Sequence, residues 1–492
     1  MLRVPLSAGD GLTALAALVG LGALVGLGEG LRRWGVAAGT TRRLVHLGVS
    51  LFVASTPLLF SGPLPVYGLA AVFTLINAGA RSRQWWSGIH EARPQSWGTV
   101  ALPLSVLPAL AATWSISPDR ILAFQTAYLV LALADPAASW IGKWAHPGPN
   151  RRKSTIAGSL TFAVITFVVT ASMLSGIGGL PVGLVFGTAI GTTLVATTAE
   201  AVSHRGWDNV FVVVAVLLVL VPMFEQVLRL TTLGVALAAG MTFGALSYVT
   251  NALDENGAAT GGLFATSLVG LGGWPWIVPG IVFFGLSSTL TGLGRGPRDE
   301  TARRTQAQVL ANGGVAWASL AVVAVVPAGM PHVLTLAYVA FIGALAAAAA
   351  DTWATELGRW SPWPPWSLSD GRRVPTGTSG AVSLIGTGSA LLGAASVVVA
   401  ALLVEGPLVG SMIPILALLV GAGVVGMMAD SVAGAFVQAQ YRAPSSGALV
   451  ERQPSPGAAP VRGWSTIGNN AVNLIGTMVG ALAAVGGVLL VG

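Results

Sequence analysis

The sequence predicts an all-α, polytopic integral membrane protein with about 16 transmembrane helices in two side-by-side helical bundles. Its composition is the first observation behind this prediction: 54% of the residues are hydrophobic, 9% are charged, and the mean hydropathy is +0.76. A soluble domain has about 25% charged residues. The second observation is that apolar runs of roughly 16–24 residues, long enough to cross a bilayer, recur along the whole chain.

The apolar runs predict helices in two successive sets. The first set is expected at 11–30, 44–61, 64–80, 99–115, 119–135, 156–175, 179–198 and 208–224. The second set is expected at 229–249, 259–272, 275–293, 309–327, 332–350, 379–404, 408–430 and 467–491. The sequence MFEQVLRL interrupts the apolar pattern between the two sets. We therefore predict two domains, with bounds 1–227 and 228–492.

The basic residues predict the orientation of the chain. All of the 25 Lys and Arg residues except Arg3, Arg120 and Arg229 lie in connecting segments that the predicted spans place on one face. These segments are 31–43, 81–98, 143–155, 199–207, 294–308, 359–378 and 431–466. Lys and Arg concentrate in cytosolic loops. We therefore expect a multi-pass protein of the prokaryotic cytoplasmic membrane, with its polar sites on the cytosolic face.

One sequence motif occurs once in each half. ALADPAASWIGK (132–143) and AAADTWATELGR (348–359) share the pattern A-x-A-D-x-x-A-[ST]-x-[IL]-G-[KR]. Each places an Asp at the end of an apolar run and a cation two helical turns later. An acid within a bilayer costs ~2.5–3.5 kcal/mol on insertion scales, so it is rarely kept without a partner. A simple helix cap is the alternative, but the recurrence favours a functional role for Asp135 and Asp351.

The polar residues of the first half suit nucleoside triphosphate chemistry. Carboxylates can hold Mg²⁺ on phosphate oxygens, Lys and Arg neutralise the charge of phosphoryl transfer, and Gly and Ser at a helix start expose N–H groups to phosphate. No GxxxxGK[ST] motif occurs, and the absence of Cys excludes thiol chemistry. The candidates are His46, Asp135 and Lys153 for catalysis, Arg43, Lys143, Ser154, Gly158 and Ser159 for the nucleotide, Asp135, Glu200 and Asp208 for metal, and Asn209 as a further polar residue.

The order of these motifs resembles a known family over about residues 29–224. RRLVH (42–46), ADPAASWIGK, KSTIAGS (153–159) and E-x7-DN (200–209) are similar to those of the phytol kinase and dolichol kinase family, which is related to phosphatidate cytidylyltransferases. The resemblance implies phosphorylation of a long isoprenoid alcohol with CTP and Mg²⁺. The loop WAHPGPN (144–150) departs from it, because a second G-x-x-x-G element is missing there.

The second half carries a different set of polar residues. Residues four apart share a helix face, so Thr352 and Glu356 are expected to align, with Asp351 beside them. Close acids repel unless a cation or a proton separates them, and VPTGTSG has the small residues of a backbone anion site. The candidates are Asp351 and Glu356 for catalysis, Asp351, Glu356 and Asp430 for metal, Arg359, Arg373, Thr376, Gly377, Thr378 and Ser379 for the nucleotide, and Arg304, Gln308, Asn312, Gln438, Asn470 and Asn473 as further polar residues.

A second resemblance covers about residues 235–490. RTQAQVLANG, ADTWATELG, VPTGTSGAVS, ADSVAGAFVQ and NNAVN are similar to motifs in a family of integral membrane proteins that includes the plant phytyl-phosphate kinase. This resemblance implies phosphorylation of a prenyl monophosphate. The pair Asn469–Asn470 departs from the Asn-Asp expected there, which weakens a metal role for Asn470.

Together the two resemblances predict a bifunctional salvage kinase. It would convert a phytol-like or geranylgeraniol-like alcohol to its monophosphate and then to its diphosphate, with CTP and Mg²⁺. The expected partners are the isoprenoid alcohol and its phosphate, a nucleoside triphosphate and the bilayer, and no nucleic acid. Two alternatives remain: a CDP-lipid synthase, which would release pyrophosphate, and a secondary transporter built from repeated halves. The oligomeric state stays open.

Overall fold

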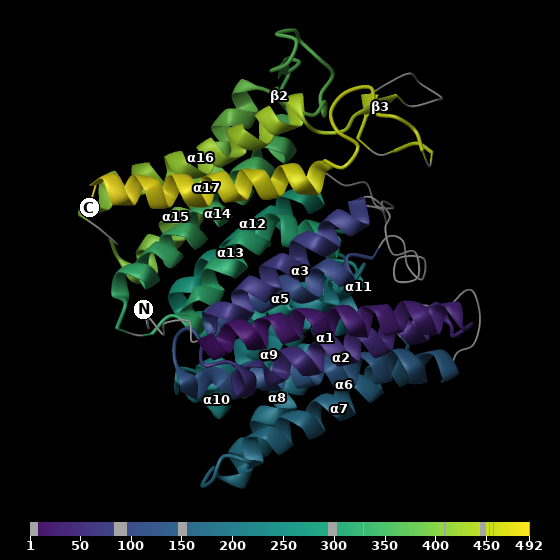
Figure 1. Cartoon of the computed structure of the whole chain (residues 1–492). Coiled ribbons are helices and arrows are strands. Elements are labelled where there is room, and N and C mark those ends of the chain that lie inside the picture. Colours follow the sequence, from purple (N-terminus) through teal and green to yellow (C-terminus); the bar gives the residue numbers. More distant parts are fainter. Residues whose placement is uncertain are drawn as a thin grey trace. The chain divides into compact units, whose positions relative to one another are not determined.

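The computed structural model describes residues 8–82, 96–145, 155–293, 303–327, 329–407, 410–442, 449–451, 453–455 and 457–491. Within these ranges the chain forms 16 α-helices and almost no sheet (Figure 1). Each predicted span coincides with one of these helices. The prediction of an all-α integral membrane protein is confirmed.

In the described ranges, the first half forms eight α-helices and one short 3-10 helix. They are α1 (Ala8–Arg33), α2 (Ala38–Leu59), α3 (Leu64–Ser82), α5 (Gly98–Ala112), the short η1 (Pro118–Arg120), α6 (Ile121–Ala145), α7 (Ile156–Ser175), α8 (Val182–Val202) and α9 (Asp208–Phe224).

The second half adds two small hairpins to its helices. Its elements are α10 (Leu230–Val249), α11 (Glu255–Ser267), the π-turn η2 (Leu268–Gly272), α12 (Trp274–Leu293), α13 (Gln306–Val325), α14 (Pro331–Gly358), β1 (Trp366–Ser367), β2 (Ala381–Val382), α15 (Leu384–Glu405), α16 (Met412–Phe436), β3 (Tyr441–Arg442), β4 (Leu449–Val450) and α17 (Asn469–Val491).

Twelve of these helices are long and apolar enough to cross a membrane, which confirms the multi-pass assignment for the described ranges. The other four are α2, α5, α9 and α11. The helices α5 and α9 are apolar but short, with 15 and 17 residues. The helix α2 is long enough, but it begins with the polar sequence TTRR, and α11 has only 13 residues. All four contribute residues to the lining of cavities.

The chain divides into two compact units, Met1–Gly234 and Val235–Gly492. The division lies within α10, whereas the sequence suggested a boundary at 227/228, just before this helix. Each unit has its own hydrophobic core. In the first unit the fully buried Phe124, Tyr128 and Leu131 of α6 occupy the centre.

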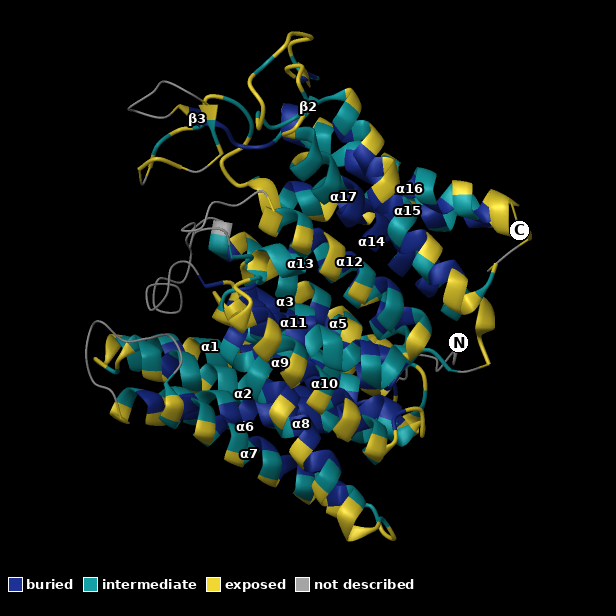
Figure 2. Cartoon of the chain, turned by 180° about the vertical axis from the view of Figure 1, so that it is seen from behind, coloured by how far each residue is buried: buried dark blue, intermediate teal, exposed yellow. Residues whose placement is uncertain are grey.

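In the core of the second unit, the backbones of α14, α16 and α17 approach one another closely. A Cβ atom on Gly426 would lie 2.5 Å from Cβ of Ala347, and one on Gly480 would lie 2.6 Å from the same atom. Small residues permit such contacts and are common between membrane helices. Figure 2 shows that buried residues lie where helices face one another and that many exposed residues lie on outer faces. Leu403 and Leu490 are among the exposed apolar residues. Exposed apolar side chains of this kind suit contact with lipid.

One pair of successive helices in each unit repeats a local arrangement. In α6 and α7, a Cβ on Gly142 would lie 3.6 Å from Cα of Gly158. In α14 and α15, a Cβ on Gly358 would lie 3.5 Å from Cα of Gly386. The helix that carries the Asp motif therefore packs on the following helix through a pair of glycines in both units.

The helix caps repeat as well. Thr155 Oγ1 accepts a hydrogen bond of 3.1 Å from the amide of Gly158, and Ser383 Oγ accepts one of 3.0 Å from the amide of Gly386. Ser, Thr, Asp and Asn are the residues that cap helix N-termini in this way. The repeat noticed in the two Asp motifs therefore extends through the next connection into the next helix.

Candidate functional sites

The first unit encloses a cavity of about 750 Å³. Helices α1, α2, α3, α5, α6 and α9 line it. One end is polar and the other is apolar, because the polar residues lie at the ends of these helices that share one side of the unit. The residues that line the polar end are Glu29, Arg33, Gly39, Arg42, Arg43, His46, Asn77, Gly98, Thr99, Asp135, Ser139, Lys143, Asp208 and Asn209.

The apolar end of this cavity continues along the same helices. Its walls include Phe52, Val53, Val66 and Val106. At ~1.5 Å per residue, the distance along α5 from Thr99 to Val106 is ~10 Å. A cavity with a charged end and an apolar part ~10 Å long fits an amphiphile whose head group lies at the charged end.

Helix α6 supplies the polar end with three residues at a spacing of four. Asp135, Ser139 and Lys143 all line the cavity, because this spacing keeps them on one helix face. On the facing helix α2, His46 Nε2 lies 3.5 Å from Asp135 Oδ2 and 3.2 Å from the carbonyl oxygen of Leu131. Six of the residues predicted for the first half thus line a single cavity: Arg43, His46, Asp135, Lys143, Asp208 and Asn209.

Helices α5 and α9 close the polar end. Asn209 Nδ2 donates to the carbonyl oxygen of Gly98 at 2.8 Å, and Arg42 donates to Ser96 Oγ at 3.0 Å. Gly206 has φ +89°, and a Cβ there would lie 2.2 Å from the amide nitrogen of Gly98, so only glycine fits. Thr99 Oγ1 is buried and has no hydrogen-bond partner among the described residues. It is a polar atom in the cavity wall that a ligand can satisfy.

The other predicted residues of the first half lie elsewhere. The amide of Gly158 is used by the Thr155 cap, and the amide of Ser159 donates to the Thr155 carbonyl. Glu200 is on α8 and does not belong to the cavity lining. Lys153 and Ser154 lie outside the described residues. Sequence reasoning did not select Arg42 or Thr99 as site residues, although both stand beside selected ones.

In the second unit, helix packing brings two acids from distant segments together. Ala347 of α14 contacts Gly426 of α16. Asp351 and Asp430 each come one turn later on these helices, and each lies within electrostatic range of the other. Asp430 also lies against α17, because a Cβ on Gly476 would be 3.0 Å from its Cβ atom. The close approach of small residues therefore places the two carboxylates at one end of the helix bundle.

Asn473 joins the helices around these acids. In the amide orientation that satisfies both of its polar atoms, Asn473 donates to Asp430 Oδ2 at 3.2 Å and to the carbonyl oxygen of Asn469 at 2.9 Å. Its side-chain oxygen then faces the Asn312 side chain at 3.1 Å. One asparagine thus connects α17 with α16 and α13. Asn470, by contrast, is exposed at the start of α17.

A third acid, Glu451, approaches the same end of the unit. It lies within electrostatic range of Asp351 and Asp430. Glu451 is solvent-accessible but has much protein around it, and the partial desolvation raises its pKa, an effect that the amide of Gln438 opposes. No sequence motif marks Glu451 as a site residue, because it lies in a Pro/Ser/Gly-rich loop. Arg304 is the cation within electrostatic range of Asp351.

The predicted nucleotide residues of the second half are spread over the loop between α14 and α15. Glu356 and Arg359 form an ion pair of 3.0 Å. Arg373 lies over the ring of Trp366, 5.4 Å from its centroid, and Thr376 and Gly377 are exposed. Thr378 Oγ1 donates to the carbonyl oxygen of Pro375 at 2.7 Å. Only Ser379 reaches the helix bundle, where it donates to Gln438 Oε1 at 2.7 Å.

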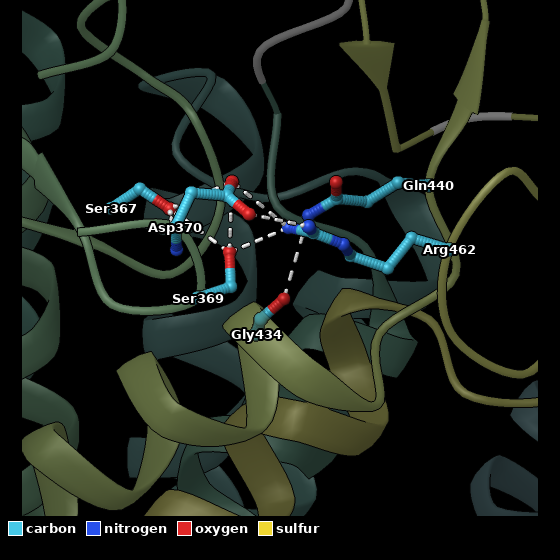
Figure 3. A network of polar contacts seen from close by, with 6 residues as sticks. All are labelled: Ser367, Ser369, Asp370, Gly434, Gln440 and Arg462. Atoms are coloured by element: carbon cyan, nitrogen blue, oxygen red, sulfur yellow. Dashed lines mark hydrogen bonds and ion pairs between the residues drawn. The ribbon is translucent and has the colours of Figure 1, made fainter. Parts of the chain in front are cut away.

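A polar clamp ties this loop to the loop that precedes α17 (Figure 3). Arg462 donates to Asp370 Oδ1 at 2.8 Å and to Ser369 Oγ at 2.6 Å. The Arg462 side chain holds the pKa of Asp370 below its usual range, mainly through this hydrogen bond. Nearby, Gln440 reaches the carbonyl oxygen of Gly434 at the end of α16. The clamp holds together the two loops that border the acidic end.

The acids of the two units are the candidate ligands for the predicted Mg²⁺. Among the described residues, no group of three or more His, Asp and Glu could hold a metal ion alone. Mg²⁺ is usually bound through one or two carboxylates together with substrate phosphates. Asp135 and Asp208 line one cavity, and Asp351 and Asp430 interact electrostatically, and the predicted Mg²⁺ stays a prediction in both units.

Comparisons with known proteins concern the second unit. Residues 238–481 match the family described as Integral membrane protein DUF92. Protein PGR of Arabidopsis thaliana is 28% identical over 260 residues, which cover 47% of this chain and 88% of the relative. No solved structure matches the chain. The similarity of the second half to an integral membrane family is confirmed, and its chemistry stays a prediction.

Proposed function

We propose that the protein phosphorylates an isoprenoid alcohol twice, once in each unit, with a nucleoside triphosphate as the donor. The observation that carries this proposal is the cavity of the first unit, about 750 Å³, with an apolar depth and a polar end that combines cations with acids. Cavities of roughly 300–1,000 Å³ enclose most of a small ligand. The resemblance of the motifs to prenol kinases supports CTP as the donor.

In the first unit the alcohol would lie with its tail between Phe52, Val53, Val66 and Val106 and its hydroxyl at the polar end. The hydroxyl oxygen attacks the γ-phosphorus, the bond from the γ-phosphorus to the bridging oxygen breaks, and the nucleoside diphosphate leaves. His46 is placed to accept the hydroxyl proton. Arg42, Arg43 and Lys143 neutralise the charge of the transferred phosphoryl group. Asp135 and Asp208 would hold Mg²⁺, which supplies electrostatic stabilisation when it is bound.

In the second unit a phosphate oxygen of the prenyl monophosphate attacks the γ-phosphorus of a second nucleotide. The nucleoside diphosphate leaves, and a prenyl diphosphate forms. The attacking group is a phosphate anion near neutral pH, since its second pKa is ≈ 6, so this step needs no general base. Asp351 and Asp430 would hold Mg²⁺ at this site. The proximity of Asp351, Asp430 and Glu451 supports a metal at this site, and Arg304 is a cation near Asp351.

Mass spectrometry of the products tests the proposal directly. Purified protein in detergent or nanodiscs would receive a prenol, CTP and Mg²⁺. We expect prenyl monophosphate, prenyl diphosphate and CDP. Pyrophosphate and a CDP-lipid would identify a cytidylyltransferase instead. Intact substrates, together with lipid movement across a sealed vesicle, would identify a transporter.

A further inference from the structure

The second unit contains a second cavity, to which no ligand has yet been assigned. It has a volume of about 180 Å³ and lies among α10, α11, α12, α13 and one residue of α14, Leu345. Its walls are apolar, with Phe243, Phe264, Phe283 and Phe284 among them. In both units, therefore, a cavity is formed mainly by the helices that precede the Asp motif.

The polar lining of this cavity comes from one strip of residues. Gln308 and Asn312 are four residues apart on α13, and Arg304 lies just before this helix; these three are the polar lining residues. Arg304 is fixed by a hydrogen bond of 3.1 Å to Thr291 Oγ1, and its backbone bonds to Ala252 and Asp254. Asn312 contacts Asn473, the residue that reaches Asp430. The polar end of the cavity is thus connected to the acidic cluster.

The size and opening of the cavity restrict what it can hold. An apolar cavity of ~150 Å³ accommodates a benzene-sized group, so this one accommodates a single chain segment and not two acyl chains. Ile281 lines the cavity and is also 59% exposed on α12. Since outer faces of these helices meet lipid, a longer chain can leave the cavity at Ile281 and continue into the bilayer.

We propose that this cavity binds the first part of the hydrocarbon chain of a single-chain lipid monophosphate, with Arg304 contacting the phosphate. The inference rests on the proposed second phosphorylation and assigns a substrate site to it. The phosphate would lie at the end of the cavity that Arg304, Gln308 and Asn312 form, beside the Asp351 and Asp430 pair. The guanidinium supplies charge-assisted hydrogen bonds that an alcohol cannot use as well.

Photolabelling of the full-length protein tests this site without turnover. The probe is dodecyl phosphate with a diazirine near the phosphate, compared with the matching dodecanol probe. We expect labelled peptides from the helices that line the cavity, α10 to α13. Ala265→Phe fills the cavity and should lower labelling at these peptides about tenfold or more, because the added ring occupies the space that the probe needs. Leu263→Phe, on the same helix but outside the lining, should leave labelling unchanged.

Arg303, the neighbour of Arg304 in the chain, provides the matched control for a substitution of Arg304. Arg304→Gln should lower labelling by dodecyl phosphate about 10- to 100-fold, the range for a hydrogen bond to a charged group, and leave labelling by the dodecanol probe intact. Arg303→Gln should change neither, because Arg303 lies outside the lining and contacts Asn251 and Tyr248. If Arg304→Gln does not fold, Arg304→Lys must keep the preference for phosphate over alcohol.

Several outcomes would overturn the inference. They are labelling that stays the same in Ala265→Phe, labelling in this unit outside α10 to α13, and equal loss of both probes in Arg304→Gln. Competition by dioleoyl phosphatidate as strong as that by dodecyl phosphate would show a two-chain lipid site instead. Labelling without any kinase activity would refute the proposed function but keep this site. Kinase activity without labelling here would refute this site but keep the proposed function.

Discussion

The same Asp motif stands in different surroundings in the two units. In α6, Asp135 lies 3.5 Å from His46, in a cavity wall that also contains Arg42, Arg43 and Lys143. In α14, Asp351 lies near Asp430 and Glu451, with Arg304 as the nearby cation. The helix, its glycine contact and the next N-cap are shared. The local motif therefore determines the helix pair, and the helices that do not repeat determine the chemistry around the acid.

The largest expected effect separates the two acids. Asp135→Asn removes the charge near His46 and should abolish phosphorylation of prenol, while supplied prenyl monophosphate is still converted to diphosphate. Asp351→Asn should do the reverse, so that monophosphate accumulates. Each loss should exceed ~100-fold, as for a preorganised electrostatic group. Product analysis of the two steps measures this. Loss of both steps in either folded variant would mean that the two units share one site.

The apolar depth of the first cavity gives a second test. Ala70 lines this cavity, and the adjacent Ala71 does not. Ala70→Phe should raise the KM for prenol about tenfold or more, since overpacking typically costs 1–3 kcal/mol. Ala71→Phe should have little effect. Because only the first unit is changed, the rate of the second step should stay constant in both variants. An unchanged KM in a folded Ala70→Phe protein would place the prenol elsewhere.

Labelling of single cysteines tests whether the acidic end of the second unit faces the cytosol. The chain has no Cys, so Thr376→Cys and Ser411→Cys each introduce one thiol, and both positions are exposed. Thr376 lies in the loop after α14, and Ser411 lies before α16, one span away. An impermeant maleimide should therefore label Thr376→Cys from the cytosolic side and Ser411→Cys from the other side. The reverse pattern contradicts the orientation and the access of cytosolic nucleotide.

The smallest expected effect concerns the clamp between Arg462 and Asp370 in the second unit. The described part of the first unit has no such clamp. Asp370→Asn removes the ion pair with Arg462. The pair is partly exposed, so we expect only a modest increase in tryptic cleavage of the two loops. The pKa of Asp370 is lower in the folded protein than in the unfolded chain. The clamp therefore stabilises the folded state above the unfolded pKa of about 3.9, and this stabilisation is lost as the pH falls through the folded pKa. Wild type and variant should therefore converge in acid.

The second site was harder to predict than the first for a physical reason. In the first half, Asp135 and Lys143 belong to one helix, so their common face follows from their spacing alone. In the second half, the sequence suggested Glu356 as the partner of Asp351, because the two residues are close along the chain. The structure pairs Glu356 with Arg359 and brings Asp430 to Asp351. Neighbours across helices depend on packing, which local spacing does not contain.

By itself the sequence determined the class of the protein and the position of each helix. Apolar run length reports directly on membrane helices, because the bilayer demands about 20 apolar residues and satisfied backbone groups. Only the tertiary structure decided which helices enclose a cavity and which acids meet. The contacts of Ala347 with Gly426 and Gly480 bring Asp351 to Asp430, and the faces of α2, α5 and α9 turn inward to form the polar end of the first cavity. These contacts join residues far apart in the chain, and they depend on the shapes of whole helix surfaces.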